Sequence, residues 1–274
     1  MTQKKKELPY LERDISWMYF NRRILQEAAR PHVPLLERMA FLGIYSNNLD
    51  EFFRVRMATQ NRIAECTDKS TSRESEHAKK LIKQISKQNT EYTKIFEETI
   101  RQTTEDLKKE NIYLISDTEV SSEQLDFIRS YYKEKLSGSI IPIWFSAIRY
   151  FDFENDENIY LAVKVSRQQG TKQISDYAFL ELPVNICGRF IRLPDHEEKS
   201  YLIYLDDVIR CCLPLVFEGL EYTDFQAYAF KFTRDAEMEI DNDRAYRYAA
   251  KDFERSKKPS SWRTSACHLR CVHA

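Results

Sequence analysis

The chain has 274 residues, of which 42% are hydrophobic and 31% are charged, so it can bury a sizeable core and lacks the composition of a disordered protein. Its 42 lysines and arginines nearly cancel its 43 acidic residues, and a net charge of -1 excludes a general attraction to nucleic acid or to a membrane surface. Only five glycines are present and they are widely spaced, which excludes both the dinucleotide-binding loop and the P-loop.

Helical patterns fill the first hundred residues. A first helix is expected with Ser16 as its N-cap, and its apolar spacing continues until Pro31. A second helix is expected from about Pro34 to Gly43, where the glycine occupies a C-cap position. A turn at residues 44–47 then leads into a third helix. These elements predict a bundle that begins with a helical hairpin.

A polar stretch at residues 67–76 predicts a loop, and it precedes a long amphipathic pattern from about His77 to Glu110. No glycine or proline interrupts that pattern. We therefore expect one long helix to complete the bundle.

The hydrophobic period changes after about residue 110. Residues 111–116 are a short apolar run, and residues 121–136 predict a helix capped by Ser121 or Ser122. Strands are expected at residues 140–145, 159–166, 176–183, 189–194, 200–205 and 226–233, with a short helix that Asp206 or Asp207 could cap. The prediction is an α+β protein: a helical domain over 1–110, a head domain with a mixed or antiparallel sheet over 111–243, and a divergent, disordered tail over 244–274.

The segment IYSNNLDEFFRVR, residues 44–56, is the most unusual on the chain because two asparagines stand at an expected helix start. By spacing alone, Asn48 is best interpreted as an N-cap whose capping-box partner is Glu51. The alternative is that the Asn48 amide, which both donates and accepts, matches the edge of an adenine. Arg54 and Arg56 could face a phosphate group, or they could be part of a solvated helix face.

Two long blocks of sequence resemble the bacterial polyphosphate kinase family. The ISWxxFNxRxLQEA and ERMxFLxIYSNNLDEFFxVR patterns lie within residues 13–58, and the head domain adds LAVKV, YAFLELP, RFIRLP, YLDDVIR and YAFKFTRDAEMEID. The resemblance covers residues 10 to about 243. It implies reversible transfer of the terminal phosphate of ATP to polyphosphate through a phosphohistidine, with Mg²⁺. It also implies that Asn48 contacts the nucleotide base and that the head domain makes homo-oligomer contacts.

The same resemblance implies that the catalytic half of the family is absent from these residues. None of the five histidines lies in a block that matches the catalytic motif, so no catalytic residue and no metal ligand are assigned. Because phosphoryl transfer needs several charged groups at once, we expect this chain alone to be inactive. The family pattern is lost after Asp243, and a truncated or frame-shifted product is one explanation of that loss. The alternatives are a non-catalytic oligomerisation or interaction module and, disfavoured by the near-neutral charge, a nucleic-acid binder.

The remaining features indicate compartment and metal content. Six cysteines, two of them adjacent, are a poor disulfide framework, and no apolar stretch approaches the length of a membrane span. We therefore expect a cytoplasmic protein. Cys267, His268, Cys271 and His273 are packed more tightly than zinc-finger ligands, so a disordered tail is preferred to a zinc site.

Overall fold

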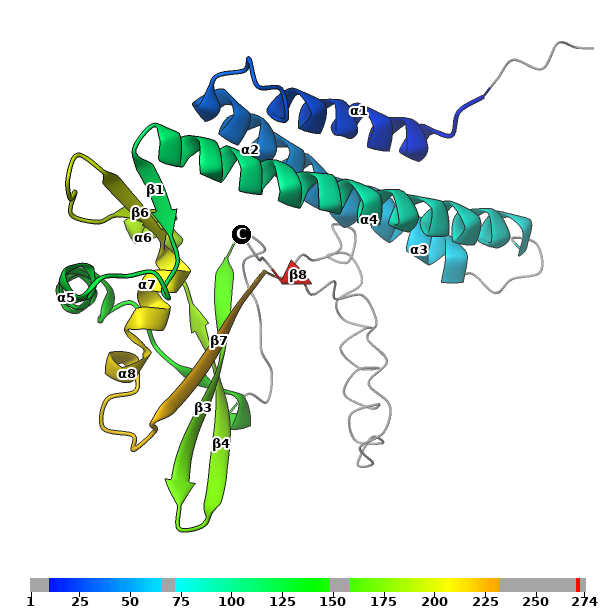
Figure 1. Ribbon diagram of the computed structural model, residues 1–274. Helices are drawn as coiled ribbons and strands as arrows, with labels where there is room; N and C mark the ends of the chain where they lie inside the picture. Colours follow the sequence, from blue (N-terminus) through cyan, green and yellow to red (C-terminus); the bar gives the residue numbers. More distant parts are fainter. Residues whose placement is uncertain (1–9, 66–71, 148–157, 232–269, 272–274) are drawn as a thin grey trace, which may run out of the picture. The chain divides into compact units, whose positions relative to one another are not determined.

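The computed structural model describes residues 10–65, 72–147, 158–231 and 270–271 (Figure 1). These residues belong to two compact units, of which the first extends to Thr103 and the second starts at Thr104. The first unit is helical and the second combines helices with two sheets, which confirms the predicted α+β class.

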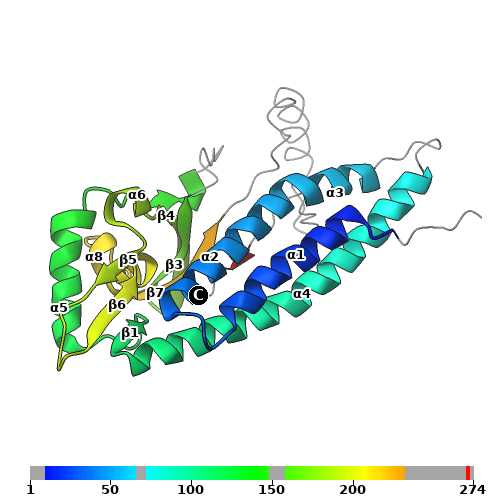
Figure 2. The same cartoon turned by 90° about the horizontal axis from the view of Figure 1, so that it is seen from above.

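The helical unit is built from long helices that lie side by side (Figure 1, Figure 2). Its elements are α1 (Arg13–Ala28), α2 (Leu35–Phe52), the π-helix η1 (Phe53–Met57), α3 (Ala58–Glu65) and α4 (Ser72–Lys109), which continues into the second unit. The core between them contains Ile15, Met18, Leu25, Leu42, Tyr45, Leu49, Phe52, Leu81, Ile85 and Tyr92. The α4 periodicity was predicted correctly, although the helix begins at Ser72 within the expected loop.

Contacts between α1 and α2 show that the two helices are antiparallel. Arg38 Nε donates to the Ala28 carbonyl oxygen at 2.9 Å near one end, and Arg56, just beyond α2, pairs with Asp14 near the other end at 3.2 Å. The N-terminus of α1 is capped by Glu12 rather than by Ser16: its carboxylate accepts from the backbone N–H of Asp14 at 2.6 Å. The predicted Ser16 cap is therefore wrong.

Helix α2 continues through the predicted turn. Gly43 is an interior residue of the helix, and the turn expected at residues 44–47 is absent from this described segment. A glycine in a helix costs about 1 kcal/mol relative to alanine, which is small beside the burial of Leu42, Tyr45 and Leu49 on the face that packs into the core. Packing thus overrides the local glycine signal.

The second unit contains two sheets with short helices. Its strands are β1 (Ile112–Ile115), β2 (Ile143–Trp144), β3 (Ile159–Gln169), β4 (Lys172–Glu181), β5 (Phe190–Arg192), β6 (Ser200–Tyr204), β7 (Asp224–Lys231) and β8 (Arg270–Cys271). Its helices are α5 (Ser122–Tyr131), η2 (Tyr132–Leu136), η3 (Phe145–Ala147), α6 (Val184–Cys187), α7 (Leu205–Cys211) and α8 (Leu213–Val216).

The two sheets match the mixed or antiparallel arrangement that the sequence predicts. One has the order β1-β6-β5, in which β1 and β6 are parallel and β5 and β6 antiparallel. The other has the order β2-β4-β3-β7-β8 and is antiparallel throughout. On β3, Leu161, Val163 and Val165 are at most 1% exposed, so alternate residues of this central strand face the core.

Helix α5 is capped by Ser121, one of the two serines that the sequence left open, and the cap is a complete capping box. The Ser121 hydroxyl accepts from the Gln124 backbone N–H at 3.3 Å, and the Gln124 side chain accepts from the Ser121 backbone N–H at 3.0 Å. We expect Ser121→Ala to lower the free energy of unfolding by about 1 kcal/mol, because a buried helix N–H loses its acceptor. Urea denaturation measures this, with Ser122→Ala as the control; equal losses in both variants would contradict a specific capping role for Ser121.

Helix α7 is not capped by an aspartate. Asp206 and Asp207 lie in the first turn of α7, but the N-cap residue is Tyr204, so neither aspartate is the predicted cap. The tail expected at 244–274 falls outside the described residues except for the two residues of β8.

Within the part of the chain that the structure describes, no helix has the length and apolar character that a membrane span needs.

Candidate functional site

Asn48 lies inside α2, more than three turns from the first residue of that helix. Its backbone N–H is therefore not one of the free donors of a helix start, and its side chain caps no helix. The N-cap interpretation of Asn48 is wrong, and so is the expectation that this segment opens a helix. Asn48 is half-buried, whereas its neighbour Asn47 is exposed, so the two amides have different environments.

A short chain of hydrogen bonds connects Asn48 to α1. The Asn48 Nδ2 group donates to Asn21 Oδ1 at 3.2 Å, and Asn21 Nδ2 donates to the backbone carbonyl oxygen of Tyr45 at 3.1 Å. Asn21 is 1% exposed, so both ends of its amide are satisfied inside the protein. Among the described residues, the side-chain oxygen of Asn48, Oδ1, has no hydrogen-bond partner, and neither does the second N–H of its Nδ2 group. Asn48 therefore keeps one acceptor and one donor for a ligand.

Aromatic packing supports this part of the α1 and α2 interface. The Trp17 and Phe52 rings stack with their centroids 4.3 Å apart and an interplanar angle of 14°. Each of these residues lies one helical turn along its helix from an amide of the pair, Trp17 from Asn21 and Phe52 from Asn48. Because both rings pack in the core of the helical unit, they limit how far the two amides can move apart.

The two arginines of the same block are engaged in ion pairs. Arg54 pairs with Glu51 at 2.8 Å on the surface. Arg56 Nε lies 3.2 Å from Asp14, a carboxylate that also accepts from Gln60 at 3.0 Å. The side chain of Asp14 is only 3% exposed, so Arg56 compensates a buried charge. These contacts favour structural roles, and they do not bring either guanidinium to the Asn48 amide.

A second cluster of charges lies in the other unit, around α7. Asp206 pairs with Arg189 at 2.8 Å and with Arg210 at 3.3 Å, and Arg210 also donates to Asp207. Burial and the nearby Asp206 carboxylate raise the pKa of Asp207 to about 6, although Arg210 opposes the shift. The two aspartates thus belong to a buried ionic network that connects α7 to Arg189, the residue before β5. Arg210 of the same network also donates to the Ala227 carbonyl oxygen on β7.

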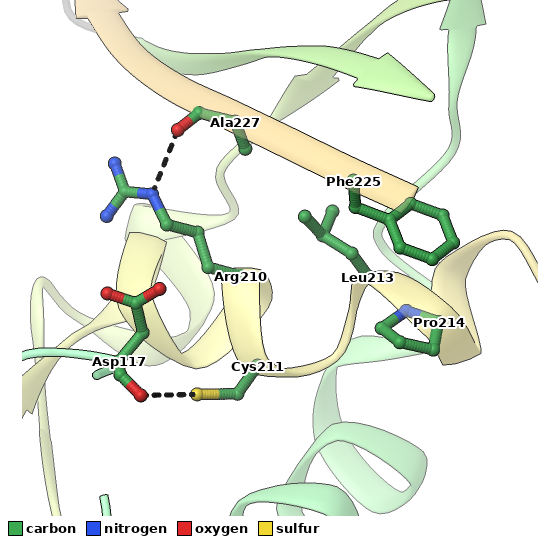
Figure 3. A pocket seen from close by; sticks show the side chains of 7 residues that line it. All are labelled: Asp117, Arg210, Cys211, Leu213, Pro214, Phe225 and Ala227. Carbon is green, nitrogen blue, oxygen red and sulfur yellow. Dashed lines mark hydrogen bonds between the residues drawn. The ribbon is translucent and has the colours of Figure 1, made fainter. Parts of the chain in front are cut away.

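A pocket of about 330 Å³ adjoins this network (Figure 3). It is lined by Asp117, Arg210, Cys211, Leu213, Pro214, Phe225 and Ala227. Arg210 already binds two carboxylates and the Ala227 carbonyl oxygen, so little of its donor capacity remains for a ligand. Burial raises the pKa of the Cys211 thiol to about 11, which leaves it neutral and unreactive near neutral pH. The pocket therefore offers no nucleophile.

Metal ligands do not gather in the described ranges. Among residues 10–65, 72–147, 158–231 and 270–271, no three His, Cys, Asp or Glu side chains are placed to hold a metal ion. Cys267, His268 and His273 of the tail lie outside those ranges. The described residues therefore provide no site for Mg²⁺.

The sequence alone pointed to Asn48 but not to its partner Asn21. The signal was present, since Asn21 falls on the same helical stripe as Asp14, Met18, Leu25 and Ala28, all of which are buried. A polar side chain on an apolar stripe needs a partner inside the protein. That partner lies 27 residues away in sequence, and only the packing of α1 on α2 identifies it.

Comparisons with known proteins agree with the resemblance. Residues 10–115 match the polyphosphate kinase N-terminal domain and residues 123–256 match the polyphosphate kinase middle domain, so the similarity extends beyond residue 243. The chain is 34% identical to a polyphosphate kinase of Vibrio vulnificus (strain YJ016) over 96% of its own length and 37% of the relative's. It is 36% identical to a polyphosphate kinase of Escherichia coli (strain K12), covering 84% of this chain and 33% of the relative.

A solved structure has the same fold. The crystal structure of polyphosphate kinase from Porphyromonas gingivalis superposes with a TM-score of 0.69 at 26% identity, over 91% of this chain and 38% of that one. The chain therefore spans about a third of the length of the relatives that it matches.

Proposed function

Because the chain belongs to the polyphosphate kinase family, we propose that it supplies the adenine-binding part of an enzyme that moves the terminal phosphate of ATP to polyphosphate and back. In this proposal the reaction passes through a phosphohistidine and uses Mg²⁺, and both belong to a catalytic half that the matched N-terminal and middle domains do not include. These 274 residues alone then bind nucleotide without transferring phosphate. The site of action is the cytoplasm, where ATP is available.

This proposal is supported by the fixed position of the Asn48 amide and by its unused hydrogen-bonding groups. The amide is held from one side by buried Asn21 and keeps an acceptor and a donor on adjacent atoms. Adenine presents a complementary pair, the N6 amino donor beside a ring-nitrogen acceptor. A half-buried, fixed amide loses little freedom when it binds such an edge, so the contact is more favourable than that of an exposed, mobile asparagine.

The test is the affinity of the purified chain for ATP. We expect Asn48→Ala to weaken ATP binding by roughly tenfold, since two hydrogen bonds of about 0.5–1.5 kcal/mol each are lost. Asn47→Ala is the matched control, because Asn47 is the same residue type on the same helix but exposed. Equilibrium dialysis with labelled ATP gives both dissociation constants.

Two results would contradict the proposal. If Asn48→Ala and Asn47→Ala bind ATP equally well, Asn48 does not contact the base. If incubation with γ-labelled ATP places phosphate on this chain alone, the chain carries catalytic groups that the proposal assigns elsewhere.

A non-catalytic oligomerisation or interaction module is the second candidate. It is favoured by aromatic side chains on one face of the larger sheet, where Tyr177 and Tyr228 are 55% and 58% exposed. Their β3 partners are Lys164 and Ala162, two residues apart, so both tyrosines project from the same face. The family resemblance suggests a second copy of the chain as the partner. Such a module needs no nucleotide, so saturable ATP binding that depends on Asn48 distinguishes the kinase proposal from it.

A further inference from the structure

The hydrogen bonds around Asn21 determine which atom of the Asn48 amide faces outward. A backbone carbonyl oxygen can only accept, so the group of Asn21 that meets the Tyr45 carbonyl oxygen must be its nitrogen, Nδ2. The Asn21 oxygen is then the atom that meets Asn48, and it can only accept as well. Asn48 must therefore direct its own nitrogen toward Asn21. Its oxygen, Oδ1, lies on the opposite side of the amide.

This arrangement is resistant to reversal. If the Asn48 amide turned over, Oδ1 of Asn48 would oppose Oδ1 of Asn21, and two acceptors would face each other without a proton. Asn21 cannot turn over in compensation, because its oxygen would then oppose the Tyr45 carbonyl oxygen. Asn21 is 1% exposed, so water cannot easily rescue either reversed state.

We propose that Asn21 is a positioning residue that holds the Asn48 amide in the orientation that selects adenine over guanine nucleotides. This inference rests on the proposed function, in which Asn48 reads the base. With Oδ1 outward, Asn48 accepts from the N6 amino group of adenine. Guanine carries the O6 acceptor at that place, so Oδ1 of a fixed amide meets a second acceptor. An amide that is free to turn presents its nitrogen to O6 and loses the preference.

The chain offers substitutions that separate positioning from general packing. Asn21→Leu is similar in size and apolar, so it keeps the core filled while it removes the acceptor for Asn48. Asn21→Asp keeps an oxygen to accept from Asn48, and in its protonated form the carboxyl group can also donate to the Tyr45 carbonyl oxygen. If Asn21 only fills the core, Asn21→Leu should change the ratio of ATP to GTP affinity less than Asn21→Asp does. If Asn21 positions Asn48, Asn21→Asp should change that ratio less than Asn21→Leu does.

The experiment measures the ratio of ATP to GTP affinity for the purified chain by equilibrium dialysis. We expect the wild type and Asn21→Asp to prefer ATP by about fivefold or more, and Asn21→Leu to bind both nucleotides within about twofold. The double variant Asn21→Leu/Asn48→Ala should have the same ratio as Asn48→Ala, since Asn21 acts only through Asn48.

The results for Asn48→Ala and Asn21→Leu test the base contact and the positioning role separately. If Asn48→Ala weakens ATP binding but Asn21→Leu keeps the wild-type ratio, the positioning role is overturned and the base contact stands. If Asn48→Ala has no effect on ATP binding, both are overturned. Circular dichroism confirms that Asn21→Leu is folded; if it is not, the ratio for Asn21→Asp decides, and a preference for ATP below about twofold in that variant overturns the positioning role.

Discussion

Phe52→Ala is expected to destabilise the helical unit by about 3–5 kcal/mol, the usual cost of removing a buried aromatic side chain. Phe52 is 2% exposed and stacks on Trp17, and its ring also meets the edge of Phe53 at a centroid distance of 6.0 Å. The alanine leaves a cavity between α1 and α2, which the long helices cannot close without losing other contacts. Because Asn48 lies one turn away, the proposed base contact implies that the same change should also weaken ATP binding.

Denaturant unfolding followed by circular dichroism measures this loss, and hydrogen exchange of α1 and α2 amides locates it. Phe20→Ala is the matched control: Phe20 lies on α1 but is 54% exposed, so its removal should change the free energy of unfolding by less than about 0.5 kcal/mol. A similar loss in both variants would show that burial of Phe52 does not determine the stability of this unit.

The long elements were predictable because their patterns repeat. Helix α4 carries recurrent apolar residues on one stripe, among them Leu81, Ile85 and Tyr92, and it has no internal glycine or proline, so its helical period is clear from about residue 77 onward. The apolar run at residues 159–166 likewise predicts strand β3, and its alternate residues Leu161, Val163 and Val165 are buried in the structure. In both cases many residues give the same local signal, and the tertiary structure agrees with it.

The errors arose where one residue was given too much weight. Gly43 indicated a helix end, but an added Cβ would meet nothing within 4 Å, so the position is simply a glycine on an open helix surface. A turn after Gly43 would place Asn48 at a helix start, which is why its spacing to Glu51 resembles that of an N-cap. The structure removes both the turn and the cap. A single weak helix former is overridden by the buried residues on either side of it.

The site itself depends on contacts that no local pattern contains. Asn21 and Asn48 are 27 residues apart, and Asp14 and Gln60 are 46 apart. The register of two antiparallel helices decides which polar residues meet, and that register follows from the packing of the whole core. The network of Asp206 and Asp207 shows the same dependence, since Arg189 belongs to a different segment from the two aspartates.

Arg210→Met is expected to lower the free energy of unfolding by about 3–5 kcal/mol at pH 8, because it leaves a buried carboxylate without its cation. Arg189 still pairs with Asp206 at 2.8 Å, so Asp207 is the group that loses its partner. Asp207 is 7% exposed, and the methionine fills much of the arginine stem without replacing its charge. The control is Arg129→Met. Arg129 forms an ion pair with Asp126 at 3.8 Å on the surface, so its loss should lower the free energy of unfolding by less than about 0.5 kcal/mol.

The loss in Arg210→Met should depend on pH in a defined direction. In the wild type, burial already raises the pKa of Asp207 from its usual value near 3.8 to about 6. Removing Arg210 takes away the favourable cation, so the pKa in the folded variant must rise further. A raised carboxyl pKa means that the folded state holds the proton more tightly than the unfolded state, so the contribution of Asp207 to stability is fully present below about pH 4. That contribution is lost as the pH rises to the folded-state pKa, which is about 6 in the wild type and higher in the variant. We therefore expect the variant to approach the wild type at pH 4 to 5 and to differ most at pH 8. Urea denaturation across this range measures it, and a loss that is independent of pH would show that packing of the arginine stem, rather than the charge of Asp207, stabilises α7.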